Sequence, residues 1–215
     1  MRIGVISDTH VPVRARALPG AIFDIFAGVD LILHAGDLIT LDVLAELQTI
    51  APVLAVHGNV DRPEVIERLT ASLRLEAQLL ADGGFKVEAS EPGAEAGFTV
   101  EVAKTRAGAG SSVKNTEARA DDERQVLPGP VGKTWTIGLV HGHEGVGRST
   151  PERAASHFPD AAIVVFGHSH QPLNEWRDGR LLFNPGSATD PRRAPSPSVG
   201  ILELGDAVNG KIIWM

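Results

Sequence analysis

Short apolar runs alternate with amphipathic stretches along the first third of the chain. The apolar runs are continuous and rich in β-branched residues, as buried strands are, and they cover residues 2–7, 31–34 and 52–57. The stretches between and after them space their apolar residues at helical intervals, which predicts helices over about 19–27, over about 41–47 and from about 61. Strands that alternate with helices indicate βαβ units and a parallel sheet.

Two of these predicted helices begin at residues that commonly cap a helix. We expect Thr40 to cap the helix over 41–47, because a hydroxyl oxygen there accepts a hydrogen bond from the first turn. Asp61, which is followed by Pro63 and Glu64, predicts the start of the next helix. We therefore interpret Asp61 as a helix cap rather than as a catalytic group.

The last third of the chain resumes the regular pattern and then becomes antiparallel. Apolar runs at 134–140 and 161–166 predict buried strands, with a helix over about 151–157 between them. Farther on, Asp178-Gly179 and Asn209-Gly210 each lie between apolar stretches. Such dipeptides favour the tight turns of β-hairpins, so two hairpins are predicted near the C-terminus.

The middle of the chain, about residues 81–130, departs from this pattern. Alternating apolar positions at 85–89 and 98–102 predict a hairpin, which we expect to pack on the domain or on another subunit. Residues 105–125 show no sustained period and are interpreted as a loop or linker. The whole pattern predicts an α/β fold, a mixed β-sheet sandwich flanked by helices, as a single domain over 1–215 with this insertion.

Composition narrows the classes of protein further. The chain has 215 residues, 43% of them hydrophobic and 22% charged, which excludes disordered and fibrous proteins. No apolar run reaches the roughly 18 residues of a membrane span, and no secretory signal is recognisable, so we expect a cytoplasmic protein without a membrane partner. Because cysteine is absent, any metal must be bound by His, Asp, Glu or Asn. The net charge of −7 argues against a protein whose main task is to bind the nucleic-acid backbone.

Polar side chains able to bind metal ions follow directly after five of the predicted strands. They are Asp8 and His10, Asp37, Asn59, His141 and His143, and His168 and His170. In α/β sheets, ligands bind at the carboxyl ends of the strands, so we expect these loops to meet at one crevice. Alternate residues of extended chain point the same way, so Asp8 is expected to act with His10, and His168 with His170.

This ordered series of motifs resembles the calcineurin-like metallophosphoesterase superfamily. The motifs are Asp8-x-His10, Gly36-Asp37, Gly58-Asn59-x-Asp61, His141 and Gly167-His168-x-His170. The early first motif and the Asn-Pro-Gly-Ser segment at 184–187 are similar to its small single-domain phosphodiesterase branch. The resemblance covers about residues 1–75 and 133–215.

The resemblance implies a phosphoesterase that uses two divalent metal ions. Asp8, His10, Asp37 and His170 would bind the first ion, and Asp37, Asn59, His141 and His168 the second. Manganese is the first choice, with Fe, Zn and Ni as alternatives, because carboxylate and imidazole ligands suit all of them. A hydroxide bridging the two ions would attack a phosphodiester, with Asp37 and Asn59 in the catalytic centre and a small-molecule phosphoester as the substrate.

One position departs from the family pattern. Many members have a histidine after the motif's asparagine, but Val60 stands there and cannot donate a proton to a leaving group. His143 is a candidate substitute as a catalytic residue, and orienting His141 is its alternative role. Asn184 and Ser187 follow a strand beside the crevice, where they would either bind the substrate phosphate or support neighbouring residues.

Other readings of the sequence stay open. Val60 and the insertion also fit a non-catalytic scaffold that binds partner proteins, as a retromer subunit resembling this family does. A nucleic-acid substrate is a third hypothesis, although no basic run or aromatic-basic pattern supports it. The insertion is compatible with a lid over the crevice or with a contact in a homo-oligomer.

Overall fold

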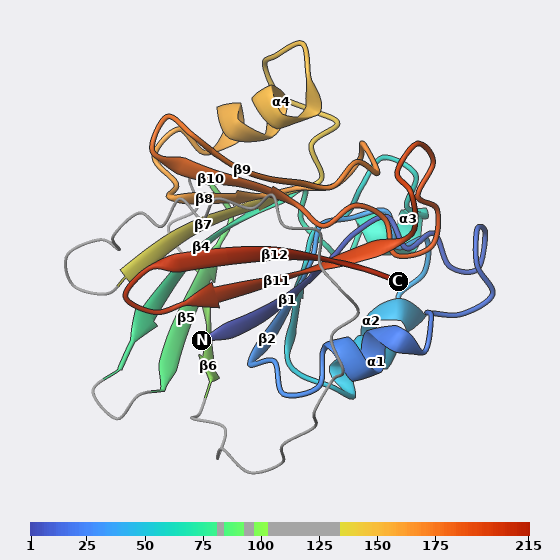
Figure 1. Ribbon diagram of the computed structural model, residues 1–215, viewed down its shortest axis with the longest axis horizontal. Coiled ribbons are helices and arrows are strands. Elements are labelled where there is room, and N and C mark those ends of the chain that lie inside the picture. Colours follow the sequence, from blue (N-terminus) through green and yellow to red (C-terminus); the bar gives the residue numbers. More distant parts are fainter. Residues whose placement is uncertain (81–83, 93–96, 103–133) are drawn as a thin grey trace.

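Two mixed β-sheets form the centre of the computed structural model, which describes residues 1–80, 84–92, 97–102 and 134–215 (Figure 1). The first sheet has the strand order β12-β11-β1-β2-β3, with β1, β2 and β3 parallel and β11 and β12 antiparallel. Its strands are β1 (Arg2–Ile6), β2 (Leu31–His34), β3 (Val53–Ala55), β11 (Ser198–Leu204) and β12 (Val208–Trp214).

The second sheet has the order β6-β5-β4-β7-β8-β10-β9. Strands β7, β8 and β10 run parallel, and the remaining neighbours pair antiparallel. Its strands are β4 (Ser72–Leu79), β5 (Phe85–Ser90), β6 (Gly97–Val102), β7 (Thr134–Val140), β8 (Ile163–Val165), β9 (Leu173–Arg177) and β10 (Arg180–Asn184).

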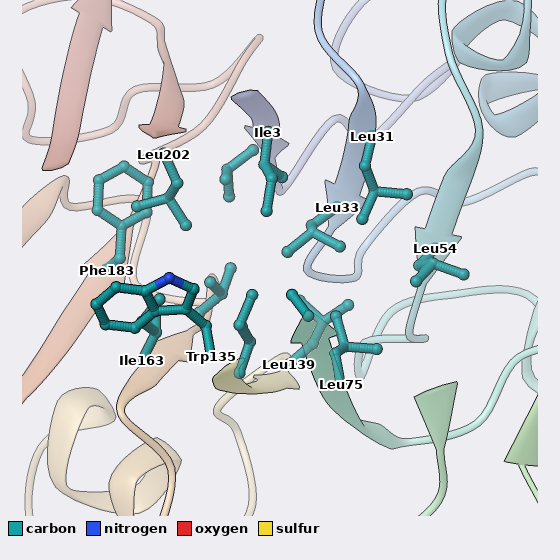
Figure 2. Packing of buried hydrophobic residues seen from close by; sticks show 14 of the residues in the cluster. Ile3, Leu31, Leu33, Leu54, Leu75, Trp135, Leu139, Ile163, Phe183 and Leu202 are labelled. Atoms are coloured by element: carbon teal, nitrogen blue, oxygen red, sulfur yellow. The ribbon is translucent and has the colours of Figure 1, made fainter. Parts of the chain in front are cut away.

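The main hydrophobic core lies between the two sheets (Figure 2). Alternate residues of each strand point inward, so Ile3 and Leu31 of the first sheet pack in one cluster with Leu75 and Leu139 of the second. Each such side chain is almost fully buried. Because a buried leucine or isoleucine contributes about 1.5–3 kcal/mol, this layer fixes the register of both sheets and hence the positions of their loops.

Helices cover the outer faces of the two sheets. They are α1 (Ala21–Ile25), α2 (Asp42–Gln48), α3 (Pro63–Ile66) and α4 (Thr150–His157). A second cluster joins the first three helices to the outer face of the first sheet, and a third joins Ala154 of α4 to Val164 and Leu182 of the second. The predicted mixed sandwich flanked by helices is therefore confirmed.

The predicted hairpin in the middle of the chain is also confirmed. Strands β5 and β6 pair antiparallel and extend the second sheet beyond β4. The predicted loop at 105–125 lies outside the described residues. No helix in the described part of the chain is long and apolar enough to cross a membrane.

Three local features differ from the sequence predictions. Strand β4 was not predicted, although Leu73, Leu75 and Ala77 alternate as its inward side. The last hairpin turns at residues 205–207 rather than at Asn209-Gly210. Gly210 lies inside β12 instead, where a Cβ atom would come within 2.6 Å of the Asn174 side chain. Thr40 does not cap α2: its hydroxyl donates to the carbonyl oxygen of Val11 at 3.5 Å.

Candidate metal centre

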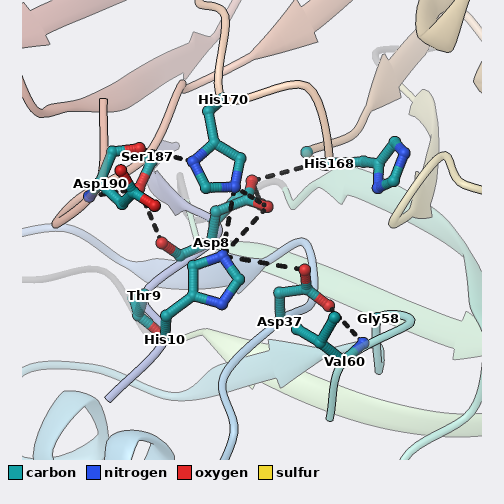
Figure 3. Close-up of polar contacts among 12 residues, drawn as sticks. Asp8, Thr9, His10, Asp37, Gly58, Val60, His168, His170, Ser187 and Asp190 are labelled. Carbon is teal, nitrogen blue, oxygen red and sulfur yellow. Dashed lines mark hydrogen bonds and ion pairs between the residues drawn. The ribbon is translucent and has the colours of Figure 1, made fainter. Parts of the chain in front are cut away.

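The loops that follow five parallel strands meet at one edge of the sandwich. Backbone hydrogen bonds join the first two loops, from Asp8 N to Gly36 O and from His10 N to Asp37 O, each at 3.0 Å. The loop after β8 joins the loop after β7 through Gly167 N and His141 O at 3.1 Å. The polar side chains that follow these strands are therefore brought together, as Figure 3 shows for several of them.

Five of the candidate ligands have left-handed backbone conformations. Their φ angles are 52° at Asp8, 45° at His10, 59° at Asp37, 64° at His168 and 57° at His170. The expectation of extended backbone in the Asp-x-His and His-x-His segments was therefore wrong. Positive φ is uncommon for residues other than glycine and costs about 1–3 kcal/mol each, so the surrounding contacts must hold this geometry.

Asp8, His10 and His170 form the first group of candidate ligands, which we call the buried end of the centre. The two imidazole Nε2 atoms lie 3.2 Å apart, and His170 Nε2 lies 3.2 Å from Asp8 Oδ1. All three side chains are buried and point at one another (Figure 3). His170 Nδ1 donates to the backbone oxygen of Asp190, which leaves its Nε2 lone pair directed at this group.

Asp37 and His141 form a second group with Asp8. His141 Nε2 lies 3.2 Å from Asp37 Oδ2, while His141 Nδ1 donates to Ala35 O at 2.8 Å. Within the described part of the chain, Asp8 Oδ1 and His141 Nε2 are buried without a hydrogen-bond partner. Buried polar atoms are rarely left so, and two lone pairs aimed at one space suit a divalent cation.

Asn59 and His168 lie beside this second group, and we call them the open end of the centre. Asn59 Oδ1 and His168 Nδ1 are 3.1 Å apart, and the rings of His168 and His141 have centroids 5.2 Å apart. Asn59 is exposed and His168 half-buried. Although they are close neighbours in sequence, His168 and His170 therefore lie at opposite ends of the candidate centre.

Two glycines allow these loops to approach so closely. A Cβ atom on Gly58 would overlap Asp37 Oδ1, and one on Gly167 would overlap Ser7 Oγ. Neither position has room for a side chain. The loops after β3 and β8 can therefore pack against the loops of the two candidate carboxylate ligands only with glycine at these positions.

The carboxylates of the centre remain ionised although they are buried. Burial alone would raise the pKa of Asp37, but the His141 imidazole, whose Nε2 faces Asp37 Oδ2 at 3.2 Å, and the Val60 N–H, which donates to Asp37 Oδ1 at 3.1 Å, lower it to about 2. Burial likewise disfavours a charge on His141, but the Asp37 and Asp8 carboxylates raise its pKa to about 9. Without a metal ion these carboxylates therefore favour a proton on His141, and a bound cation would take the place of that proton.

At the open end, the pKa of the histidine is lowered rather than raised. Burial and the charge of His141 lower the pKa of His168 to about 4, which keeps its ring neutral at neutral pH. Burial also lowers the pKa of His10 at the buried end and that of His143 outside the ligand groups. Neutral imidazole is the form that binds metal ions.

His143 lies next to the centre but outside both ligand groups. Its ring centroid is 5.4 Å from that of His141 and 6.1 Å from that of His168. Its Nε2 faces Glu144 Oε1 at 3.4 Å, while its buried Nδ1 has no hydrogen-bond partner among the described residues. Because this contact leads away from the ligands rather than to His141, the catalytic role of His143 stays a prediction.

Asn184 and Ser187 are buried and support the loops of the centre. The Asn184 amide donates to Gly167 O at 2.9 Å and to Ser169 Oγ at 3.0 Å. The Ser187 hydroxyl donates to Asp8 O at 2.7 Å and accepts from Asp190 N at 2.9 Å. Of the two roles left open by the sequence, these contacts favour support of neighbouring residues, and substrate binding stays a prediction.

Asp61 has a role that the sequence interpretation missed. Its carboxylate accepts hydrogen bonds from the backbone N–H of Gly58 at 2.7 Å, Ile39 at 2.6 Å and Asp37 at 3.1 Å. Helix α3 has Arg62 as its cap residue and no side-chain cap, so the prediction of Asp61 as cap was wrong. Asp61 instead ties the loop carrying Asp37 to the loop carrying Asn59, a long-range contact that local sequence patterns do not reveal.

Comparisons with known proteins agree with this geometry. A family model described as the calcineurin-like phosphoesterase superfamily domain matches residues 1–207. A probable metallophosphoesterase from Methanothermobacter thermautotrophicus is 34% identical, covering 99% of this chain and 92% of its own length. Another from Methanocaldococcus jannaschii is 50% identical, covering 99% of this chain and 81% of its own length.

Solved structures share the fold. A Vps29 single mutant from Entamoeba histolytica is similar with a TM-score of 0.60 and 22% identity, covering 100% of this chain and 99% of that one. A structure described as a novel archaeal phosphodiesterase has a TM-score of 0.54 and 19% identity, covering 99% of this chain and 100% of that one. With a family model over nearly its whole length and relatives that align with 99% of it, this chain belongs to the calcineurin-like phosphoesterase superfamily.

Proposed function

We propose that the protein is a dinuclear metal-dependent phosphodiesterase. The observation that carries this proposal is the meeting of seven side chains at one edge of the sandwich, five in the two buried groups with Asn59 and His168 beside them. Two buried atoms there, Asp8 Oδ1 and His141 Nε2, have no hydrogen-bond partners among the described residues. Carboxylate, imidazole and amide donors suit manganese, and they suit iron, zinc and nickel as well.

The residues divide into two ligand sets that share Asp37. Asp8, His10, Asp37 and His170 would hold one ion, and Asp37, Asn59, His141 and His168 the other. Asp37 Oδ2 supports this division, because it lies 3.2 Å from His141 Nε2 and 3.9 Å from His10 Nε2. Two such ions supply an activated water and neutralise the charge that develops on a phosphoryl group.

Protonation of the leaving group depends on the side chains beside the centre. Val60, half exposed beside Asn59, offers no proton. His143 is the neighbouring imidazole, with its Nε2 near Glu144 Oε1 and its ring close to both His141 and His168, but burial lowers its pKa and so weakens its hold on a proton. A phosphodiester with a good leaving group is therefore the expected substrate type, since its departure needs least help from an acid.

Hydrolysis of bis(p-nitrophenyl) phosphate with added Mn²⁺ tests the proposal. Wild type should release p-nitrophenol, and Asp37→Asn should be slower by about a thousandfold, because several kcal/mol of metal-dependent stabilisation is lost. Asp24→Asn, an exposed change on α1, is the matched control and should behave as wild type. Equal rates for wild type and Asp37→Asn would contradict the proposal.

A non-catalytic scaffold is the second candidate. Val60 at the position of the expected histidine favours it, and the fold is shared with a solved Vps29. The two buried groups of candidate ligands argue against it. A purified protein that binds no Mn²⁺ and hydrolyses no phosphoester would favour the scaffold.

A further inference from the structure

Two arginines from different loops lie at the rim of the buried end. Arg14 belongs to the loop after β1, where its backbone N–H donates to His10 O at 2.8 Å. Arg192 belongs to the loop between β10 and β11. Both guanidinium groups face the same oxygen, Asp190 Oδ2, at 3.5 Å from Arg14 Nε and 4.0 Å from Arg192 Nε. One carboxylate therefore holds the two cations side by side.

Asp190 places this pair against the candidate ligands. Its backbone oxygen accepts the hydrogen bond from His170 Nδ1, and its backbone N–H donates to Ser187 Oγ at 2.9 Å. The same residue thus carries both the oxygen that accepts from His170 and the carboxylate that the two guanidinium groups face. The arginine pair is therefore tied to the buried end through Asp190.

The two arginine side chains are accessible to a ligand. The side chains of Arg14 and Arg192 are 61% and 50% exposed, and that of Asp190 is 25% exposed. Two guanidinium groups against one carboxylate leave a positive charge in excess, on a chain whose net charge is −7. Arg192 also has a φ angle of 49°, uncommon for a residue other than glycine, and lies in a turn closed by the hydrogen bond from Ala194 N to Pro191 O at 2.8 Å.

We infer that Arg14 and Arg192 form a subsite for a second phosphate group, so that the substrate is a phosphoester carrying an additional phosphate beyond the one that is cleaved. This inference rests on the proposed function. The guanidinium fork matches phosphate oxygens and binds them with charge-assisted hydrogen bonds. Neither arginine belongs to the ligand sets, so each can select the substrate without holding a metal ion.

Competitive inhibition by two matched nucleotides tests the subsite. Thymidine 5′-monophosphate and thymidine 3′,5′-bisphosphate differ by a single phosphate, and each is titrated against hydrolysis of bis(p-nitrophenyl) phosphate with Mn²⁺. We expect the bisphosphate to have an inhibition constant about tenfold lower in wild type. Arg14→Gln and Arg192→Gln should each reduce this ratio to about two. Arg193→Gln, the exposed neighbour, should keep the wild-type ratio.

Salt gives an independent readout of the same subsite. Raising ionic strength to about 1 M shortens the screening length to about 3 Å, so the wild-type ratio should fall toward that of the Gln variants. Equal inhibition constants in wild type, or a ratio that survives in both Arg14→Gln and Arg192→Gln, would overturn the inference. Wild type that hydrolyses no diester would instead overturn the proposed function itself.

Discussion

The two ends of the candidate metal centre differ in how the protein holds them. At the buried end, Asp8 and His170 are completely buried and His10 is 6% exposed. At the open end, Asn59 is exposed and His168 is half-buried. One half of the centre is thus enclosed by the fold, and the other faces the solvent from which a substrate arrives.

The hydrogen bonds behind the side chains differ in the same way. Asp8 accepts from Ser7 Oγ at 2.6 Å, and its backbone oxygen accepts from Ser187 Oγ at 2.7 Å. Asn59, by contrast, meets His168 at 3.1 Å through side chains alone. A preorganised site loses less entropy when it binds. The comparison therefore predicts a tightly bound ion at the buried end and a more readily exchanged ion at the open end.

Removal of a carboxylate from the buried end has the largest expected effect. Asp8→Asn keeps the size of the side chain but removes a charge that faces both ligand groups. Hydrolysis of bis(p-nitrophenyl) phosphate should fall by about a thousandfold, and the bound Mn²⁺ should fall with it. Circular dichroism controls for folding, and wild-type metal content in this variant would contradict the account.

Substitution at the open end should separate the two ions. His168→Asn removes one ligand from the open end but leaves Asp8, His10 and His170 in place. The protein should keep one tightly bound Mn²⁺ and lose the second, and hydrolysis should fall by about a hundredfold. Elemental analysis after dialysis measures the ions, with His170→Asn as the matched variant that should lose the tight one. Loss of the tightly bound ion in His168→Asn would contradict the assignment of that ion to the buried end.

Ser187 tests the support of the buried end with a smaller expected change. Ser187→Ala removes the hydroxyl that holds Asp8 O and Asp190 N. Mn²⁺ affinity at the buried end should fall about 10- to 100-fold, as is typical for residues that orient ligands. Calorimetric titration measures it, with Ser156→Ala, an exposed change on α4, as the matched control. An unchanged affinity in Ser187→Ala would show that the support is dispensable.

His34 gives a predicted effect of a different kind, one on stability as a function of pH. Burial lowers the pKa of His34 to about 3 from 6.5, while Gly36 N donates to its Nδ1 at 3.2 Å. Between those pH values the unfolded chain binds a proton that the folded protein excludes, so stability falls as the pH falls from 6.5 toward 3. The unfolding free energy of wild type should drop faster than that of His34→Asn, by up to about 1.4 kcal/mol per pH unit. Parallel slopes in urea titrations would contradict this.

The sequence predicted the fold where local pattern and burial agree. The strands at 31–34 and 134–140 have the predicted bounds: the first is buried on both faces, and the apolar positions of the second are buried. Strand β4 was missed, and the helix that Val65, Ile66 and Leu69 suggested by their spacing ends at Ile66. Gly210 resembles a turn residue in sequence, but it pairs with Leu202 inside β12, where a side chain would meet Asn174.

The candidate site was predictable in its residues and less so in its geometry. The polar residues follow the strand ends, so their approach to one another could be expected from topology. The positive φ angles of Asp8 and His168, and the three hydrogen bonds accepted by Asp61, depend on loops distant in sequence. Such contacts arise only when both sheets have assembled, so no local pattern contains them.

Anomalous diffraction from crystals loaded with Mn²⁺ tests the central claim most directly. The account predicts two peaks that flank the Asp37 carboxylate. One should lie among Asp8, His10 and His170, with the higher occupancy, and the other among Asn59, His141 and His168. A single peak, or peaks away from Asp37, would contradict the claim that the two ends of this centre bind a pair of ions.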